Sequence, residues 1–310
     1  MPSATTKNPQ SEPDKEAEVK KLDLMIAGKL KEFEKERKRR CYLLDSEIYQ
    51  GDVNRVYEEL RAGFQWEGGE LDIIVESSGG DIDASFNLSN LFRKAGSKGL
   101  SFFIPRWAKS AATLLVCSGN DIYMTDIAEL GPLDPQISVF TPIEKRYEEF
   151  SPKDIDGALD IIWNEFEKDH DKLAKELIGR LQWPLTLGGI KKSLELGEQY
   201  LIKLLETGML KGKAPDELKE IAKRLSTGYA SHGFCINCDE ARELGLIVKN
   251  MNGKVLDICW EIYKLINEKK KMETKMKRKE MEDILKEIPI DDYQKVENAL
   301  SNDNGTGAIK

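Results

Sequence analysis

Histidine and cysteine are scarce in this chain, and several common sequence signatures are missing. Only two histidines and five cysteines occur among 310 residues. The cysteines are odd in number and scattered, so they do not form a disulfide framework. No run of 18 apolar residues occurs, and the N-terminus lacks the apolar segment of a signal peptide. We therefore expect a cytoplasmic protein with no membrane partner.

Two nucleotide-binding loops are also missing. The chain contains no Gly-x-x-x-x-Gly-Lys-Ser/Thr loop and no Gly-x-Gly-x-x-Gly loop, which argues against a built-in P-loop ATPase and a nicotinamide site. Any dependence on ATP would come from a separate ATPase or regulatory partner. The formal net charge of −8 also disfavours nucleic acid as a partner. We expect no cofactor and no nucleic-acid ligand.

The composition is that of a globular enzyme with polar flanks. Hydrophobic residues make up 40% of the chain, enough for a large core. The sequence predicts a disordered lead over residues 1–20, a catalytic domain over 21–250 and a helical, charged extension over 251–310. The last ten residues of this extension are expected to be disordered.

A charge-dense run follows the predicted lead. Residues 22–40 predict a solvated helix, and its basic cluster, Arg37 to Arg40, is interpreted as part of that helix surface. Residues 41–44 then predict the first strand, and residues 52–62 the first helix of the catalytic domain.

A serine lies where a predicted strand turns into a helix. The apolar run 100–104 predicts the strand and the small residues 111–118 predict the helix, with Ser110 between them. A hydroxyl at this point lies beside free backbone N–H groups, which favour a developing negative charge. Ser110 is therefore a candidate acyl-transfer nucleophile, and the alternative is an ordinary helix N-cap.

Paired glycines follow the preceding predicted strand. Residues 71–75 predict a buried strand, and Gly79 and Gly80 come just after it, before an amphipathic helix that ends near Ala95. Glycine lets the backbone turn its N–H groups outward without a Cβ penalty, as an oxyanion hole requires. These glycines are candidates for that role.

A further strand and a rigid loop complete the unit. Residues 120–124 predict the strand, and residues 131–136 predict a loop that carries one acidic group, Asp134. The expected order is strand, Gly-Gly turn, helix, strand, serine, helix, strand and acidic loop.

This order and spacing resemble the superfamily of the Clp protease proteolytic subunit, signal peptide peptidase A and crotonase. Ser77–Gly80 is similar to the Ser-Pro-Gly-Gly oxyanion turn of those peptidases, and Lys109–Ala112 to their nucleophile segment. Asp239–Ile247 is similar to the Glu-Ala-x-x-x-Gly-Leu element that closes their core. The resemblance implies an α/β fold with a Clp peptidase/crotonase-like repeated ββα spiral core, a helical insert and helical N- and C-terminal extensions.

Within that superfamily the chain most resembles the serine dehydrogenase proteinase family, whose triad runs in the order Ser, Asp, His. Ser110, Asp134 and His232 occur in this order. The resemblance implies Ser110 as nucleophile, His232 as general base and Asp134 as the group that orients the imidazole. The oxyanion hole would be formed by the backbone N–H groups of Gly79 or Gly80 and Ala111.

Other residues remain alternatives for the acid and the base. Asp126 and Asp239 are alternative acids, although Asp239 also suits a helix cap. A serine–lysine dyad would use Lys145 or Lys153, but a lysine base needs burial to lower its pKa, and both lie among charges. Lys109 adjoins the serine, where neighbouring helical side chains diverge.

Two further histidine interpretations are weaker. The second histidine, His170, lies in a charged helical stretch and is predicted to be on a solvated face. His232, Cys235 and Cys238 are three candidate metal ligands that could in principle hold a metal and so compete with the triad, but no second pair completes a zinc site. We expect no metal.

A long helical insert is predicted over residues 151–225, with breaks near Trp183-Pro184 and Gly188-Gly189. Apolar residues recur there at three- and four-residue steps and predict one buried face for core and subunit contacts; they include Ile161, Ile162, Phe166, Leu173, Leu177 and Leu181. Substrate gating is an alternative role.

Two classes of function follow. The first is a serine peptidase of the serine dehydrogenase proteinase type that acts on a peptide or protein substrate as a homo-oligomer. The second is a non-hydrolytic protein on the same fold, either a catalytically inactive scaffold or a crotonase-like acyl-CoA enzyme.

Overall fold

The computed structural model describes residues 12–63, 68–141, 146–168, 170, 172–173, 175–176 and 184–287. The chain divides into two compact units. The core unit comprises residues 29–263, and the described part of the helical unit comprises residues 12–28 and 264–287.

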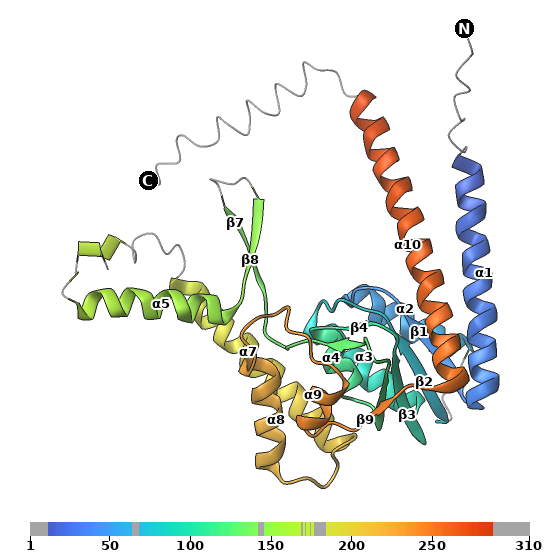
Figure 1. Ribbon diagram of the computed structural model, residues 1–310, viewed down its shortest axis with the longest axis horizontal. Helices are drawn as coiled ribbons and strands as arrows, with labels where there is room; N and C mark the ends of the chain where they lie inside the picture. The colour runs from blue at the N-terminus through green and yellow to red at the C-terminus, as the bar shows by residue number, and fades with distance from the viewer. Residues whose placement is uncertain are drawn as a thin grey trace. The chain divides into compact units, whose positions relative to one another are not determined.

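A five-stranded parallel sheet forms the centre of the core unit (Figure 1). Its order is β1-β2-β3-β5-β9. The strands are β1 (Arg40–Leu44), β2 (Glu70–Val75), β3 (Gly99–Ile104), β5 (Asp121–Met124) and β9 (Val248–Asn250). Strands β2 and β3 bury nearly all their side chains, as expected of a parallel sheet covered on both faces. The α/β class is confirmed, whereas the repeated spiral core stays a prediction.

Helices connect successive parallel strands, because each connection must bring the chain back to the end of the sheet at which the strands begin, and further helices precede β1 and follow β9. In chain order they are α1 (Glu12–Arg37), α2 (Gln50–Gly63), α3 (Ile82–Ala95), α4 (Ala111–Val116), α5 (Pro152–Glu167), α7 (Pro184–Thr207), α8 (Pro215–Thr227), α9 (Cys238–Glu243) and α10 (Gly253–Glu287).

Aromatic contacts link helices to the sheet. Phe33 of α1 meets Phe103 of β3 edge-on, with ring centroids 5.0 Å apart. Phe92 of α3 contacts Tyr42 of β1 at 5.4 Å. The other strands are short: β4 (Trp107–Ala108) pairs in parallel with β6 (Glu129–Leu130), and β7 (Ile137–Thr141) pairs antiparallel with β8 (Arg146–Phe150).

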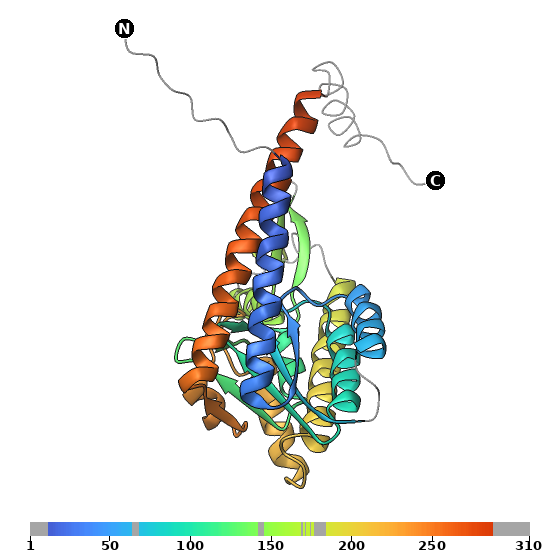
Figure 2. The ribbon, with the colours of Figure 1, turned by 90° about the vertical axis from the view of Figure 1, so that its right-hand side faces the viewer.

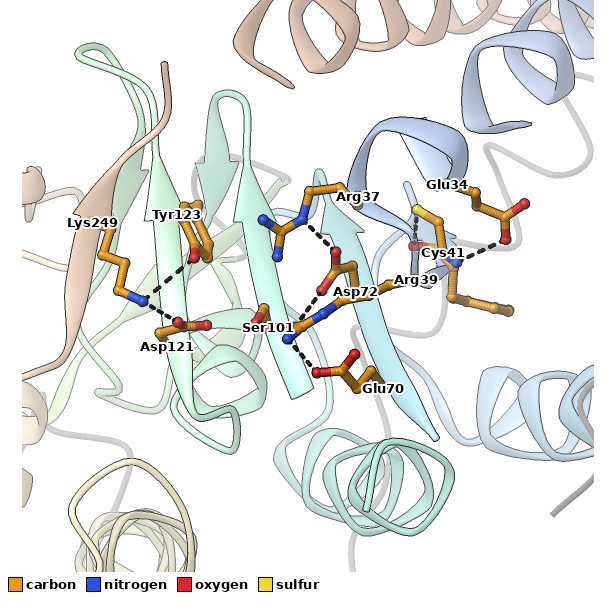
Figure 3. A network of polar contacts seen from close by, with 11 residues as sticks. Glu34, Arg37, Arg39, Cys41, Glu70, Asp72, Ser101, Asp121, Tyr123 and Lys249 are labelled. Carbon is orange, nitrogen blue, oxygen red and sulfur yellow. Dashed lines mark hydrogen bonds and ion pairs between the residues drawn. The ribbon is translucent and has the colours of Figure 1, made fainter. Parts of the chain in front are cut away.

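A buried carboxylate corrects the interpretation of the basic cluster. Asp72 of β2 is fully buried and accepts from Arg37 Nε at 2.7 Å and from Arg39 Nη1 at 3.3 Å (Figure 3). Arg39 also contacts Glu70 at 2.6 Å. Helix α1 ends at Arg37 and Arg40 opens β1, so the cluster is not one solvated helix surface. A buried charge has to be paired, and these arginines supply the partners.

Other parts of the structure also differ from the predictions. Helix α1 begins at Glu12, inside the predicted disordered lead, because Pro13 suits the first turn of a helix. Residues 1–11 and 288–310 lie outside the described residues, and so does the predicted disordered end. Gly188-Gly189 lies inside α7, which starts at Pro184, since a helix tolerates glycine at about 1 kcal/mol per residue. The β7–β8 hairpin was not predicted at all.

The helical insert is only partly buried. Ile162 is 7% exposed, but Ile161 is 61% exposed. Phe166 and Leu173 are also exposed, which contradicts a single buried face within this chain. Leu177 and Leu181 lie outside the described residues. Ile161 and Ile162 are neighbours in a helix, and successive helical side chains point about 100° apart. The two isoleucines therefore cannot lie on the same narrow face.

The helical unit contains the first part of α1 and the last part of α10, which diverge toward their outer ends in Figure 1 and overlap in the view of Figure 2. Leu22, Ile26 and Ile266 are buried there, and Lys269 Nζ contacts Asp23 Oδ1 at 2.6 Å. Across the described residues, no helix has both the length and the apolar character needed to cross a bilayer.

Candidate functional site

Ser110 occupies a strained turn between β4 and α4. Its backbone has φ 51° and ψ −124°, outside the regions that L-residues ordinarily adopt. Such a conformation costs about 1–3 kcal/mol and persists only where the surroundings enforce it. Ser110 stands at the N-cap position of α4, yet its hydroxyl makes no capping hydrogen bond within the described chain. The N-cap alternative is therefore not what this side chain does.

Backbone pairing brings the glycine turn against this serine. Ser77 forms a parallel bridge with Ala108, with the Ser77 N–H donating to Trp107 O at 2.9 Å. Two residues beyond each bridge partner lie Gly79 and Ser110, which the parallel register places together. A Cβ on Gly79, whose φ is 115°, would lie 2.7 Å from Ser110 Cβ. Only glycine permits this approach.

The three candidate oxyanion donors are not equivalent. The Gly79 N–H donates to Ser77 Oγ at 3.2 Å. The Gly79 C=O accepts a hydrogen bond of 2.8 Å from Ile48 N. The Gly80 N–H belongs to the same trans peptide and points in the opposite direction, so it points away from Ile48. Gly80 and Ala111 both line the cavity described below, and within the described chain neither N–H has an acceptor.

An antiparallel bridge brings together the candidate base and acid. Leu130 and Ile236 exchange two backbone hydrogen bonds of 2.9 and 3.1 Å. Four residues after Leu130 lies Asp134, and four residues before Ile236 lies His232, so the antiparallel register places them opposite each other. His232 Nδ1 lies 2.8 Å from Asp134 Oδ1. Gln136 Nε2 donates to the other Asp134 oxygen at 3.2 Å.

A cavity of about 430 Å³ contains these groups. Its wall includes Ser110, Asp134, His232, Gly80 and Ala111. Asp134 is only 6% exposed, whereas the His232 side chain is 33% exposed, so the imidazole is reachable and the carboxylate is shielded. The remaining lining residues are Glu47, Tyr49, Ser78, Ile82, Leu133, Pro135 and Gln136.

The alternative acids lie elsewhere. Asp126 accepts from Asn250 Nδ2 at 3.4 Å, and Asp239 pairs with Arg242 at 2.8 Å. Neither lines the cavity. Asp239 does not cap α9 either, because Asn237 caps it through the N–H groups of Asp239 and Glu240.

The alternative bases also find other positions. Lys109 Nζ pairs with Glu129 at 2.6 Å. Lys145 lies outside the described residues, and Lys153 is described only as part of helix α5. His170 is exposed and contacts Glu165 at 2.8 Å. In the described part of the chain, no group of three or more His, Cys, Asp or Glu gathers closely enough to hold a metal ion.

Glu129 holds the segment around the serine through two cations. It contacts Arg106 Nη1 and Lys109 Nζ, both at 2.6 Å. Burial raises the pKa of Glu129, but the hydrogen bonds and charges of Lys109 and Arg106 outweigh burial and leave this pKa below its ordinary value.

A buried threonine that the sequence analysis missed joins the two functional loops. The Thr113 hydroxyl lies 2.7 Å from Ala108 O and 2.9 Å from Gly131 O, and it accepts from Gly131 N at 3.0 Å. It thereby ties the serine turn to the loop that leads to Asp134. Only its place three residues after Ser110 could have indicated this role.

Helices of the insert support the same loop. Leu133 N donates to Leu225 O of α8 at 2.9 Å, and a Cβ on Gly197 of α7 would lie 3.2 Å from Ile82 Cδ1. Tyr200 of α7 stacks on Phe86 of α3 with centroids 4.0 Å apart. This part of the insert therefore packs against the core beside the cavity.

Comparisons of the sequence identify relatives but no activity. Two uncharacterised proteins of Methanocaldococcus jannaschii are 28% and 27% identical to this chain over 196 and 195 residues. The matches cover 62% and 63% of the chain but only 56% and 58% of those proteins, so the chain spans little more than half of their length. No protein-family model matches the chain.

Solved structures show a partial likeness. Two structures of a membrane-bound stomatin-specific protease, one with a substrate peptide, have TM-scores of 0.43 at 13% identity. They cover 69% of this chain and 79% and 75% of the protease chains. A ClpP1 variant from Listeria monocytogenes has a TM-score of 0.40 at 14% identity, covering 70% of this chain and 94% of that one. At these scores the function has to be inferred from the site itself.

Proposed function

We propose that this protein is a serine hydrolase that cleaves peptide bonds through Ser110, His232 and Asp134. The observation that carries the proposal is the 2.8 Å contact between His232 and Asp134 in the cavity that Ser110 also lines. The contact engages Nδ1, which leaves Nε2 as the nitrogen that takes a proton.

The proposed reaction has two steps, acylation of Ser110 and hydrolysis of the acyl-enzyme. Ser110 Oγ attacks the carbonyl carbon while His232 accepts the hydroxyl proton, and Asp134 stabilises the imidazolium that forms. The backbone N–H groups of Gly80 and Ala111 hold the oxyanion, because they are the candidate donors on the cavity wall. His232 then protonates the leaving amine, and a water molecule that it activates releases the acyl group from Ser110.

The first test is labelling with a fluorophosphonate probe, which reacts with an activated serine. We expect Ser110→Ala to abolish labelling, and His232→Ala and Asp134→Asn to slow it by about two orders of magnitude or more. His170→Ala and Asp126→Asn are the matched controls and should label like the wild-type protein. Cleavage of a mixed peptide pool, read by mass spectrometry, then separates a peptidase from another hydrolase.

The opposite outcome has a definite meaning. Absence of labelling in folded wild-type protein would refute the hydrolase and favour the scaffold or acyl-CoA alternative. Homo-oligomeric assembly and a separate ATPase or regulatory partner remain predictions, which size-exclusion chromatography with light scattering and affinity capture can address.

A further inference from the structure

One wall of the cavity is an extended segment after β1. Ile48 is fully buried, and its backbone pairs with the glycine turn, donating to Gly79 O at 2.8 Å and accepting from Asp81 N at 2.7 Å. Side chains alternate along an extended segment, so Glu47 and Tyr49 point away from Ile48. Both of them line the cavity. The pairing of Ile48 therefore sets the position of a carboxylate beside the candidate oxyanion hole.

Two hydroxyl groups hold the Glu47 carboxylate. The Ser78 hydroxyl donates to Glu47 Oε1 at 3.3 Å, and the Tyr49 hydroxyl donates to Oε2. The hydrogen bond to Glu47 raises the pKa of the Tyr49 phenol, as expected beside an ionised carboxylate. Ser78 immediately precedes the Gly79-Gly80 turn, so the orientation of this carboxylate is coupled to that turn.

Among the described residues, the Glu47 carboxylate forms no ion pair, and its hydrogen-bond partners there are the Ser78 and Tyr49 hydroxyls. The residues that line the cavity include no lysine or arginine. The other carboxylate on the wall, Asp134, is engaged by His232. Asp81 and Asp83 flank Ile82 but do not line the cavity: Asp81 accepts from Ala84 N, and Asp83 accepts from the Tyr200 hydroxyl. The carboxylates on the cavity wall are therefore Glu47 and Asp134, and of the two Glu47 is the one not engaged by His232.

We infer that Glu47 forms a subsite for a basic side chain, so that the substrates are peptides with lysine or arginine next to the scissile bond. This inference rests on the proposed serine hydrolase function. A cationic side chain placed there would form an ion pair with Glu47, whereas an acidic side chain is repelled by it. Because Glu47 is exposed, the pair is screened by solvent and the preference is modest, about threefold.

The experiment compares three diphenyl phosphonate probes that differ only in side chain: lysine-like, norleucine-like and glutamate-like. In each reaction Ser110 Oγ forms a bond to phosphorus and phenol leaves, so no turnover is needed. Labelling rates are measured for the wild type and for Glu47→Gln, Glu47→Lys and Glu58→Gln. Glu58 lies exposed on α2 outside the cavity and controls for the loss of one negative charge.

For each variant we compare the labelling rates of the three probes as ratios. A partial loss of folded protein lowers all three rates equally and leaves the ratios unchanged. We expect the wild type and Glu58→Gln to prefer the lysine-like over the norleucine-like probe about threefold, with the preference weakening at high salt. Glu47→Gln should remove the preference, and Glu47→Lys should favour the glutamate-like probe. Tyr49→Phe keeps the carboxylate and should keep the preference.

The two proposals fail in different ways. Equal rates for the three probes, with Ser110 still labelled by the fluorophosphonate, would overturn the basic subsite and leave the hydrolase intact. A lysine preference that survives in Glu47→Gln would also overturn it. No labelling by the fluorophosphonate or by any of the three diphenyl phosphonates would refute the hydrolase itself, and the subsite with it.

Discussion

At the scale of single residues, the site depends on conformations that few residue types can adopt. Ser110 holds a positive φ of 51° without the freedom of glycine, and Gly79 holds a φ of 115° directly against it. The backbone pairs between Ser77 and Ala108 enforce this contact. Strain at such a point stays in the folded protein only because several neighbouring interactions oppose its relief.

Gly79→Ala tests this arrangement. An alanine Cβ would lie 2.7 Å from Ser110 Cβ and 2.8 Å from Lys109 O at a backbone conformation that alanine disfavours. We expect fluorophosphonate labelling to be lost and the free energy of unfolding to fall by about 1–3 kcal/mol. Gly51→Ala, which meets no atom within 4 Å on helix α2, should keep full labelling. Normal labelling of Gly79→Ala would contradict the close contact.

At the scale of elements, short strands outside the main sheet assemble the site. Strand β4 pairs with β6, and bridges at Ser77 and at Ile236 extend this pairing on either side. The glycine turn follows Ser77, the serine turn follows Ala108 of β4, and the acidic loop follows Leu130 of β6. Glu129 of β6 reinforces the set, since it pairs with Arg106 and Lys109 around β4.

Glu129→Gln should show a defined pH dependence. The folded-state pKa of Glu129 is lowered, so its stabilising contribution is fully present above its ordinary value of 4.5 and is lost as pH falls through the lowered value. We expect the variant to have a lower Tm than the wild type at pH 7, and the difference to shrink below pH 4.5. Thermal unfolding followed by circular dichroism measures both. A Tm difference that does not change with pH would show that the pairs contribute no ionic stabilisation.

At the scale of the whole molecule, the candidate site lies entirely within the core unit. Its residues run from Glu47 to His232, inside residues 29–263. The helical unit buries far fewer apolar side chains, with Leu22, Ile26 and Ile266 as its buried residues in the described chain. Few buried contacts allow local opening at low free energy.

Hydrogen exchange should therefore distinguish the two units. We expect amides of residues 12–28 and 264–287 to exchange faster than those of β2 and β3, whose side chains are almost all buried. Exchange followed by mass spectrometry at peptide resolution measures this difference in the full-length chain. Equal protection of both sets would mean that other contacts stabilise the helical unit.

The parts of the fold that depend on local patterns were predicted from the sequence. Strands β2 and β3 are mostly apolar, with Asp72 and Ser101 as exceptions inside them, and α3 and α4 follow them with helical patterns, so these elements are confirmed nearly to the residue. Predictions from local sequence patterns were wrong where contacts between distant segments determine the structure. Arg37 at the end of α1 and Arg39 just after it pair with the buried carboxylate of Asp72 on β2. The β7–β8 hairpin has only weak alternation of apolar residues.

The sequence by itself determined the residue types of the candidate site and their order along the chain. A strand-to-helix serine, a pair of glycines and one acidic loop are all local features. Only the tertiary structure decided that Asp134 meets His232, 98 residues away, and that Thr113 and Glu47 join the site. The physical reason is that such contacts depend on the register of backbone pairs between distant segments, and no local pattern encodes that register.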